Sequence, residues 1–227
     1  MKKTWVKGYN TPMLKVVVFD FDGVIVDSNH IKEDAFYRLF EGHPHISREL
    51  VADVLMRNVG TRFDILRDIF VRSGAPADEI TRLVDENAAH LDTMVQERIS
   101  MRGLAPGARE TLEELSKNLC LYINSATPVD ALKTTVAHLG IQDHFRAVHG
   151  APPCKEENLR AIMAREGVEA GEVVVIGDGE GDMLSATACG THFIAINSGF
   201  YPWGENPAFP VVPSIRAARA VLEKITV

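Results

Sequence analysis

The sequence predicts an α/β protein with a doubly wound parallel sheet and an all-helical cap domain. Two observations favour this fold class: short apolar runs alternate with stretches of helical period, and one long segment has no clear strand. The runs are continuously apolar and rich in β-branched residues, which is typical of parallel strands buried on both faces. They cover residues 16–19, 119–123, 173–176 and 193–196.

In the segments between these strands, apolar residues recur with the period of an α-helix. The expected helices cover residues 109–117, 129–139, 156–165 and 181–189. Gly140, Gly167 and Gly190 stand just beyond three of these segments. Glycine is favoured at this place because it adopts the left-handed conformation that ends many helices.

The segment without a strand runs from residue 31 to residue 100 and contains only amphipathic helical candidates. The longest of them is expected at residues 78–98, and the glycine- and proline-containing stretch 103–107 would lead back to the sheet. We therefore predict a core domain of residues 1–30 and 101–227 with a helical cap domain of residues 31–100.

Composition narrows the class of protein. The chain has 227 residues, of which 46% are hydrophobic and 24% charged, so a folded globular protein is expected. Its net charge of -7 disfavours nucleic acid and anionic membranes as partners. No apolar run reaches the roughly 20 residues of a membrane span, and a cytoplasmic protein is expected. The three cysteines have no metal-type spacing, and we expect them to be reduced and mostly buried.

Polar and acidic residues follow the apolar runs. Asp20 and Asp22 follow the first run, Ser125 the second, and Asp178 and Asp182 the third. Ligands of open α/β sheets bind outside the carboxyl ends of the strands, so these side chains are expected to converge. Clustered carboxylates favour a hard divalent cation such as Mg²⁺. The alternative is that each aspartate only ends a strand or caps a helix.

The joint pattern resembles a known family. Residues 20–27, Ser125, Lys155 and residues 177–182 resemble the four ordered motifs of the haloacid dehalogenase (HAD) superfamily, over about residues 16–199. The branch that it is most similar to contains the phosphoglycolate phosphatases and the β-phosphoglucomutases. This resemblance implies a Rossmann-like core, a small helical cap between the first two motifs, and a Mg²⁺-dependent enzyme.

The resemblance also implies a role for each motif residue. Asp20 would be the nucleophile that becomes an aspartyl phosphate, and Asp22 the general acid and base, brought round by a turn at Gly23. Ser125, with the N–H of Ala126, would bind the phosphoryl oxygens, and Lys155 would offset their charge. The metal would be held by residues of the first and fourth motifs: Asp20, Asp22, Asp178 and Asp182.

Some of these residues also have plainer interpretations. Ser125 could cap the following helix, and Thr127 before Pro128 is the better candidate for that cap. Lys155 alone would be read as a surface lysine, and Glu156 follows it where many relatives have proline. Glu180 could support the metal or only place a favourable charge in the first turn of a helix.

In the cap, the segment that contains Thr61 and Arg62 resembles a loop that recognises the leaving group of the substrate in such caps. An arginine offers a fork of donors that suits a phosphate or carboxylate. The alternative is that Thr61 caps a helix and Arg62 is solvated.

The expected function is Mg²⁺-dependent hydrolysis of a small-molecule phosphate monoester, such as a sugar phosphate or phosphoglycolate. Asp22 favours phosphoryl transfer, because dehalogenating relatives have no alkoxide to protonate and lack it. The alternatives are a β-phosphoglucomutase-like phosphotransferase and a catalytically silent scaffold. Lys32 and Gly177 stand where the mutases have histidine and glutamate, which favours hydrolysis.

Overall fold

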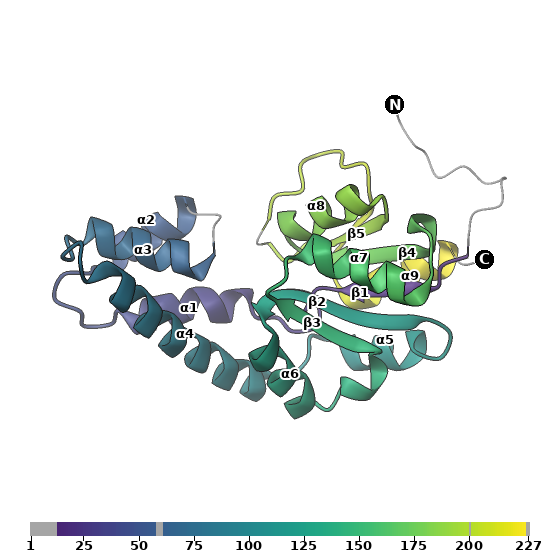
Figure 1. Cartoon of the computed structure of the whole chain (residues 1–227), viewed down its shortest axis with the longest axis horizontal. Coiled ribbons are helices and arrows are strands. Elements are labelled where there is room, and N and C mark those ends of the chain that lie inside the picture. Colours follow the sequence, from purple (N-terminus) through teal and green to yellow (C-terminus); the bar gives the residue numbers. More distant parts are fainter. Residues whose placement is uncertain (1–12, 58–60, 200, 226–227) are drawn as a thin grey trace. The chain divides into compact units, whose positions relative to one another are not determined.

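The computed structural model describes residues 13–57, 61–199 and 201–225 (Figure 1). The chain divides into two compact units, which we call the core unit and the cap unit. The core unit extends to Asp27 and resumes at Arg102, and the cap unit is Ser28–Met101. No helix in the described part of the chain combines the length and hydropathy needed to cross a membrane.

The core unit is built on a parallel sheet, six-stranded within the described residues, with the order β3-β2-β1-β4-β5-β6. The order places β1 in the interior of the sheet, between β2 and β4. This confirms the predicted fold class. The strands are β1 (Val16–Phe19), β2 (Cys120–Pro128), β3 (Ala147–Ala151), β4 (Val173–Gly177), β5 (His192–Ile196) and β6 (Val211–Val212).

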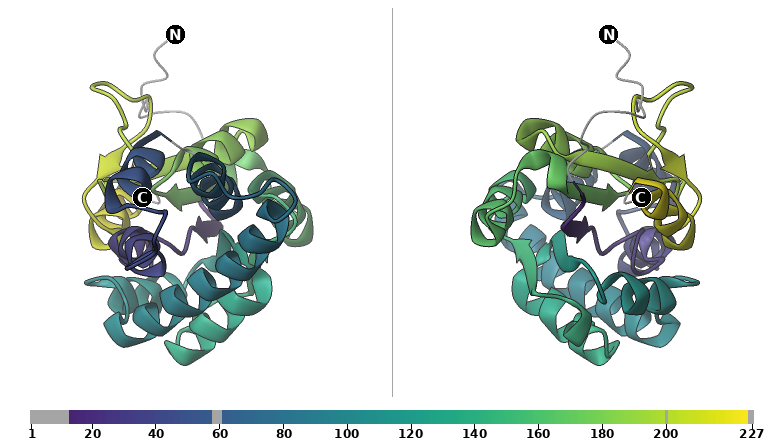
Figure 2. Two further views of the ribbon diagram at one scale, coloured as in Figure 1. Left: turned by 90° about the vertical axis from the view of Figure 1, so that its left-hand side faces the viewer. Right: turned by 90° about the vertical axis from the view of Figure 1, so that its right-hand side faces the viewer.

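Helices cover both faces of this sheet, as Figures 1 and 2 show. Helices α7 and α8 pack against each other on the face that carries Val16, Val18 and Tyr122, and α5 packs against α9 on the other face. The helices are α5 (Ala108–Leu115), α6 (Val129–His138), α7 (Lys155–Glu166), α8 (Glu180–Cys189) and α9 (Ile215–Ile225), with short 3₁₀ turns at Gln142–His144 and Ala170–Glu172.

The described part of the cap unit is helical, as the sequence predicts. Its helices are α1 (Asn29–Leu39), α2 (Arg48–Arg57), α3 (Arg62–Arg72) and α4 (Ile80–Arg102). The aromatic rings of Phe40 and Phe70 meet edge to face at 5.7 Å between centroids, and both side chains are buried. Helix α4 is the long helix expected near residues 78–98.

The cysteines differ in part from expectation. All three are free thiols, but none is fully buried: Cys120 and Cys189 are partly exposed and Cys154 is exposed. Cys154 immediately precedes α7, where the chain turns at the surface before the helix begins. The prediction of mostly buried cysteines is therefore wrong.

Candidate active site

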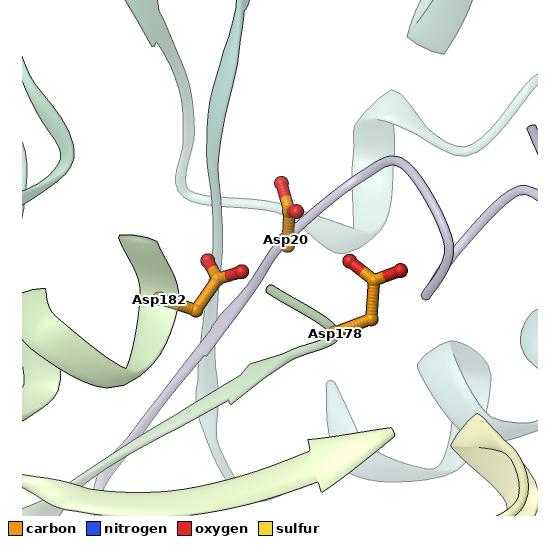
Figure 3. A group of neighbouring side chains, drawn as sticks. All are labelled: Asp20, Asp178 and Asp182. Atoms are coloured by element: carbon orange, nitrogen blue, oxygen red, sulfur yellow. The ribbon is translucent and has the colours of Figure 1, made fainter. Parts of the chain in front are cut away.

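Three aspartates meet at the carboxyl edge of the sheet. Asp20 directly follows β1 and Asp178 directly follows β4, and these strands pair in register, so the two residues are neighbours. Asp182 lies in the first turn of α8. All three are buried, and each offers a carboxylate oxygen within 4.8 Å of the others. Figure 3 shows their side chains around one shared space.

The close approach of Asp182 depends on Gly177, the last residue of β4. A Cβ at position 177 would lie 2.3 Å from the Cβ of Asp182, far closer than two such carbons pack. The N–H of Gly179 also donates to Asp182 Oδ2 at 3.3 Å, which folds the side chain back over the start of α8. Glycine at 177 thus lets Asp182 lie against the end of β4.

Lys155 places a positive charge among these carboxylates. It is the first residue of α7, and its Nζ lies 2.6 Å from Asp182 Oδ1 and 3.0 Å from Asp20 Oδ2. Burial alone would lower the pKa of Lys155, but the charges of Asp182 and Asp20 outweigh it and raise that pKa. Lys155 is therefore a cation in the site and not a surface lysine.

The chemistry of this group fits a divalent metal. Burial raises the pKa of the Asp182 carboxyl, the charge of Asp20 adds to this, and Lys155 opposes it. Three carboxyl groups share this buried place with one lysine, and a divalent cation would offset the negative charge that they carry when ionised. Carboxylate oxygens are the hard ligands that Mg²⁺ prefers. The cluster does not include the Asp22 carboxylate, although the sequence analysis placed Asp22 with the ligands.

Asp22 lies in a tight turn beyond β1. Gly23 has a φ of 73°, a left-handed conformation that glycine adopts without a steric penalty, and its N–H donates to the Val26 carbonyl at 2.8 Å. The Asp22 carboxylate accepts a hydrogen bond from Thr127 Oγ1 at 2.8 Å. The Thr127 hydroxyl, near the end of β2, therefore helps to fix the orientation of Asp22.

Thr127 is not the helix cap that the sequence suggested. Helix α6 begins at Val129, its cap position is Pro128, and no side chain caps it. Ser125 is not the cap either: it is buried in β2, and its Oγ accepts the N–H of Thr127 at 3.1 Å. The hydroxyls of both residues thus make hydrogen bonds near the aspartates and do not cap α6. Ala126, which lies between them, is exposed.

Two buried asparagines, which sequence reasoning missed, support Lys155. The side chain of Asn124, in β2, donates to the backbone carbonyl of Lys155 at 2.8 Å. The side chain of Asn158, in α7, donates to Asn124 Oδ1 at 3.1 Å. This pair joins the end of β2 to the start of α7. The sequence feature that could have indicated this role is the position of Asn124, a polar residue directly after the apolar run 119–123.

The loop after β5 reaches the same edge, which no pattern in the sequence predicts. Ser198 Oγ donates to Asp178 Oδ2 at 2.7 Å, and the Tyr201 hydroxyl donates to Glu180 Oε1 at 3.3 Å. The aromatic ring of Tyr201 lies 4.8 Å from that of Trp203, measured between centroids, and the two rings are tilted by 60°. Phe200 lies outside the described residues.

In the cap unit, Thr61 acts as the N-cap of α3. Its hydroxyl donates to Asp64 Oδ2 at 2.6 Å, and its N–H donates to the same oxygen at 2.8 Å. The Asp64 N–H returns a bond to the Thr61 hydroxyl, completing a capping box. The hydroxyl of Thr61 is therefore engaged in holding the helix start, as the alternative interpretation has it.

Arg62, the first residue of α3, is not a freely solvated side chain. Its Nη2 lies 3.0 Å from Asp92 Oδ2, its guanidinium carbon lies 4.6 Å from the centre of the Phe63 ring, and the side chain is 23% exposed. Its Nε is buried and has no hydrogen-bond partner among the described residues. Burial raises the pKa of Asp92, while the charges of Arg62 and Lys32 lower it.

Three buried aspartates and a lysine meet at the carboxyl edge of a doubly wound sheet. A helical segment is inserted between the first two strands, which is typical of α/β enzymes that have a cap domain. A model of the haloacid dehalogenase-like hydrolases matches residues 14–190. The chain belongs to that family and is a hydrolase.

Individual relatives are similar over most of the chain, and solved structures share its fold. The phosphoglycolate phosphatase of Photorhabdus laumondii is 28% identical over 204 residues, which cover 86% of this chain and 85% of that protein. The β-phosphoglucomutase structure from Clostridium difficile superposes with a TM-score of 0.69 at 20% identity, covering 94% of this chain and 97% of that one. The magnesium-bound HAD hydrolase YfnB of Bacillus subtilis gives 0.70 at 16% identity, covering 93% and 99%.

Proposed function

We propose that this enzyme is a Mg²⁺-dependent phosphatase that hydrolyses small-molecule phosphate monoesters through an aspartyl phosphate on Asp20. The observation that carries the proposal is the buried group of Asp20, Asp178 and Asp182 bridged by Lys155. The group provides a nucleophile, a site for a metal and a fixed positive charge at one place. These are the parts that transfer of a phosphoryl group requires.

Asp20 is the nucleophile of the first step. Its Oδ1 accepts the N–H of Phe21 at 2.7 Å and its Oδ2 faces Lys155, so the carboxylate is held in one orientation. One of its oxygens attacks phosphorus, and the bond from phosphorus to the ester oxygen breaks. The leaving alkoxide takes a proton from Asp22, whose carboxyl is oriented by Thr127.

In the second step Asp22 works in the opposite direction. It takes a proton from a water molecule, and the resulting hydroxide attacks the phosphorus of the aspartyl phosphate. The bond to Asp20 breaks, so inorganic phosphate leaves and the carboxylate of Asp20 is restored. Ser125 and the N–H of Ala126, in the C-terminal half of β2, bind the phosphoryl oxygens during both steps.

Asp20, Asp178 and Asp182 would hold the metal. When bound, Mg²⁺ supplies charge that stabilises the phosphoryl oxygens in the transition state. Lys155 spans Asp20 and Asp182, and it therefore both positions the nucleophile and offsets part of the negative charge.

The substrate class is proposed from the relatives and the cap. Relatives matched over 85% of their length are named phosphoglycolate phosphatase, and phosphoglycolate is a small anionic ester. Arg62, with an unsatisfied buried Nε and a fork of donors, suits an anionic group on the leaving portion of a substrate. We therefore propose phosphoglycolate or a sugar phosphate as the substrate. Thr61 is left out of this assignment because its hydroxyl caps α3.

Two alternatives are less well supported. A mutase has a glutamate at position 177, and here a side chain at that position would collide with Asp182. Lys32 also stands where the mutases have histidine. A silent scaffold has no chemical need for a largely buried lysine that bridges two buried carboxylates, because such an arrangement is costly unless the charges are used or compensated.

The first test is activity on a generic aryl phosphate. We expect the purified protein to release phosphate from 4-nitrophenyl phosphate with Mg²⁺ present, and chelation with EDTA to abolish this because the carboxylate cluster then lacks its cation. Restoring Mg²⁺ in excess should restore the rate. Activity that persists unchanged in EDTA would contradict the metal assignment, and inactivity on a broad panel of phosphate esters would favour the scaffold.

The second test concerns Arg62. Arg62→Ala should lower kcat/KM for an anionic substrate such as phosphoglycolate by roughly ten- to a hundredfold, the loss of a charge-assisted pair worth about 1.5 to 3 kcal/mol. It should leave kcat/KM for 4-nitrophenyl phosphate almost unchanged. Arg67→Ala, which alters another arginine of α3, is the matched control. An equal loss on both substrates would show that Arg62 does not discriminate leaving groups.

A further inference from the structure

A hydroxyl from the loop after β5 is bonded to one of the metal-binding carboxylates. Ser198 Oγ donates to Asp178 Oδ2 at 2.7 Å, a short bond in a partly buried place. We propose that Ser198 is a positioning residue for the metal site: its hydroxyl holds the Asp178 carboxylate in the orientation that binds Mg²⁺. This inference rests on the proposed function, since it takes the aspartate cluster as the magnesium site.

Lys155 and Ser198 contact different carboxylates of the cluster. Lys155 Nζ lies 3.0 Å from Asp20 Oδ2 and 2.6 Å from Asp182 Oδ1, whereas Ser198 Oγ donates to Asp178 Oδ2. Mg²⁺ requires nearly ideal octahedral geometry, so a ligand that rotates freely binds it less well. A hydrogen bond to an ionised carboxylate is stronger than one between neutral groups, and it fixes the plane of the carboxylate.

The backbone that presents Ser198 is itself held in place. Asn197, one residue earlier, donates its N–H to the Val212 carbonyl at 2.8 Å, which ties the end of β5 to β6. The indole N–H of Trp203 donates to the Ile196 carbonyl at 3.0 Å. In the register of β4 and β5, Gly177 pairs with Ala195, so Asp178 is level with Ile196 and Ser198 lies two residues further along. The hydroxyl therefore comes from a loop residue next to a strand end that is held by hydrogen bonds.

The test is direct metal binding to the full-length protein without substrate. Isothermal titration with MgCl₂ should give a dissociation constant for Ser198→Ala about 10- to 100-fold above the wild-type value, the usual effect of losing a partner of a metal ligand. At saturating Mg²⁺ most of kcat should return, and KM for 4-nitrophenyl phosphate should change little. In EDTA the melting temperature should match that of the wild type, because the altered bond lies in a partly exposed loop.

Two control variants distinguish a role of Ser198 in positioning Asp178 from a general disturbance of the metal site. Ser198→Thr keeps the hydroxyl and should keep Mg²⁺ affinity close to that of the wild type. Ser185→Ala removes another buried hydroxyl of the same region, one that donates to the backbone carbonyl of Asp182 at 2.8 Å and not to a carboxylate. Its Mg²⁺ affinity should also be unchanged.

The outcomes distinguish this inference from the proposed function. Unchanged affinity in Ser198→Ala, or an equal loss in Ser198→Thr or Ser185→Ala, overturns the role of Ser198 and leaves the phosphatase proposal standing. A wild-type protein that binds Mg²⁺ but hydrolyses no phosphate ester overturns the phosphatase, while the titration still decides the role of Ser198. A wild-type protein that binds no Mg²⁺ overturns both.

Discussion

Asp20→Asn is expected to lower turnover of every phosphate ester by about 10³-fold or more and to give no phosphoenzyme. An amide nitrogen or oxygen does not replace the carboxylate as nucleophile, and the variant also loses a charge beside Lys155. The measurement is phosphate release at saturating Mg²⁺ together with intact-mass analysis of the protein during turnover. A phosphorylated Asp20→Asn protein would show that another residue is the nucleophile.

Asp22→Asn is the matched comparison, since it makes the same chemical change two residues away. With an alkyl phosphate, loss of the general acid should cost about 10²- to 10⁴-fold. With 4-nitrophenyl phosphate, whose leaving group needs little protonation, the first step should survive and the second should be slow. A burst of nitrophenol and an accumulated phosphoenzyme are then expected. Equal loss of the phosphorylation step in both variants would contradict the division of roles between Asp20 and Asp22.

Gly177→Ala is expected to lower kcat by about a hundredfold, although it adds a single methyl group. The new Cβ would lie 2.3 Å from the Cβ of Asp182, an atom fixed by the backbone, so the start of α8 has to move. That movement takes Asp182 away from Lys155 and disturbs the cluster, and misplacement of about 1 Å in a site can cost about 10²-fold. Steady-state kinetics and thermal melting measure the two consequences.

Gly181→Ala is the control for this prediction. Gly181 lies in α8, four residues further along the chain, and a Cβ there meets no atom within 4 Å. Alanine in a helix is favoured over glycine by about 0.5–1 kcal/mol, so this variant should be fully active and no less stable than the wild type. If Gly177→Ala behaves like Gly181→Ala, the packing of Asp182 against β4 does not matter to catalysis.

The sheet interior was predictable because burial on both faces leaves a clear pattern. The predicted run 16–19 coincides with β1, and 173–176 falls one residue short of the end of β4. The edge strand β3 (Ala147–Ala151) was missed, since a polar histidine and a glycine interrupt it and most of its residues are only partly buried. The two-residue β6 is too short to leave a pattern.

The site was predictable to the extent that strand ends and motif order determine it. Asp20, Asp178 and Asp182 do lie together, and Lys155 does begin a helix and reach two of them. The hydrogen bonds that orient these side chains could not be predicted from the sequence. Thr127 contacts Asp22 across 105 residues of sequence, and such pairs depend on how strands are ordered in the sheet and not on any local pattern.

The close packing of Gly177 under Asp182 has a consequence for how this enzyme can diverge. A side chain becomes admissible at 177 only after the residue at 182 loses its bulk or α8 shifts at its start. The two positions are therefore sterically coupled, and a glutamate at 177 is not compatible with Asp182 in its present place. We expect a single Gly177→Glu change to displace Asp182 and to impair the enzyme, unless residue 182 or the start of α8 changes with it.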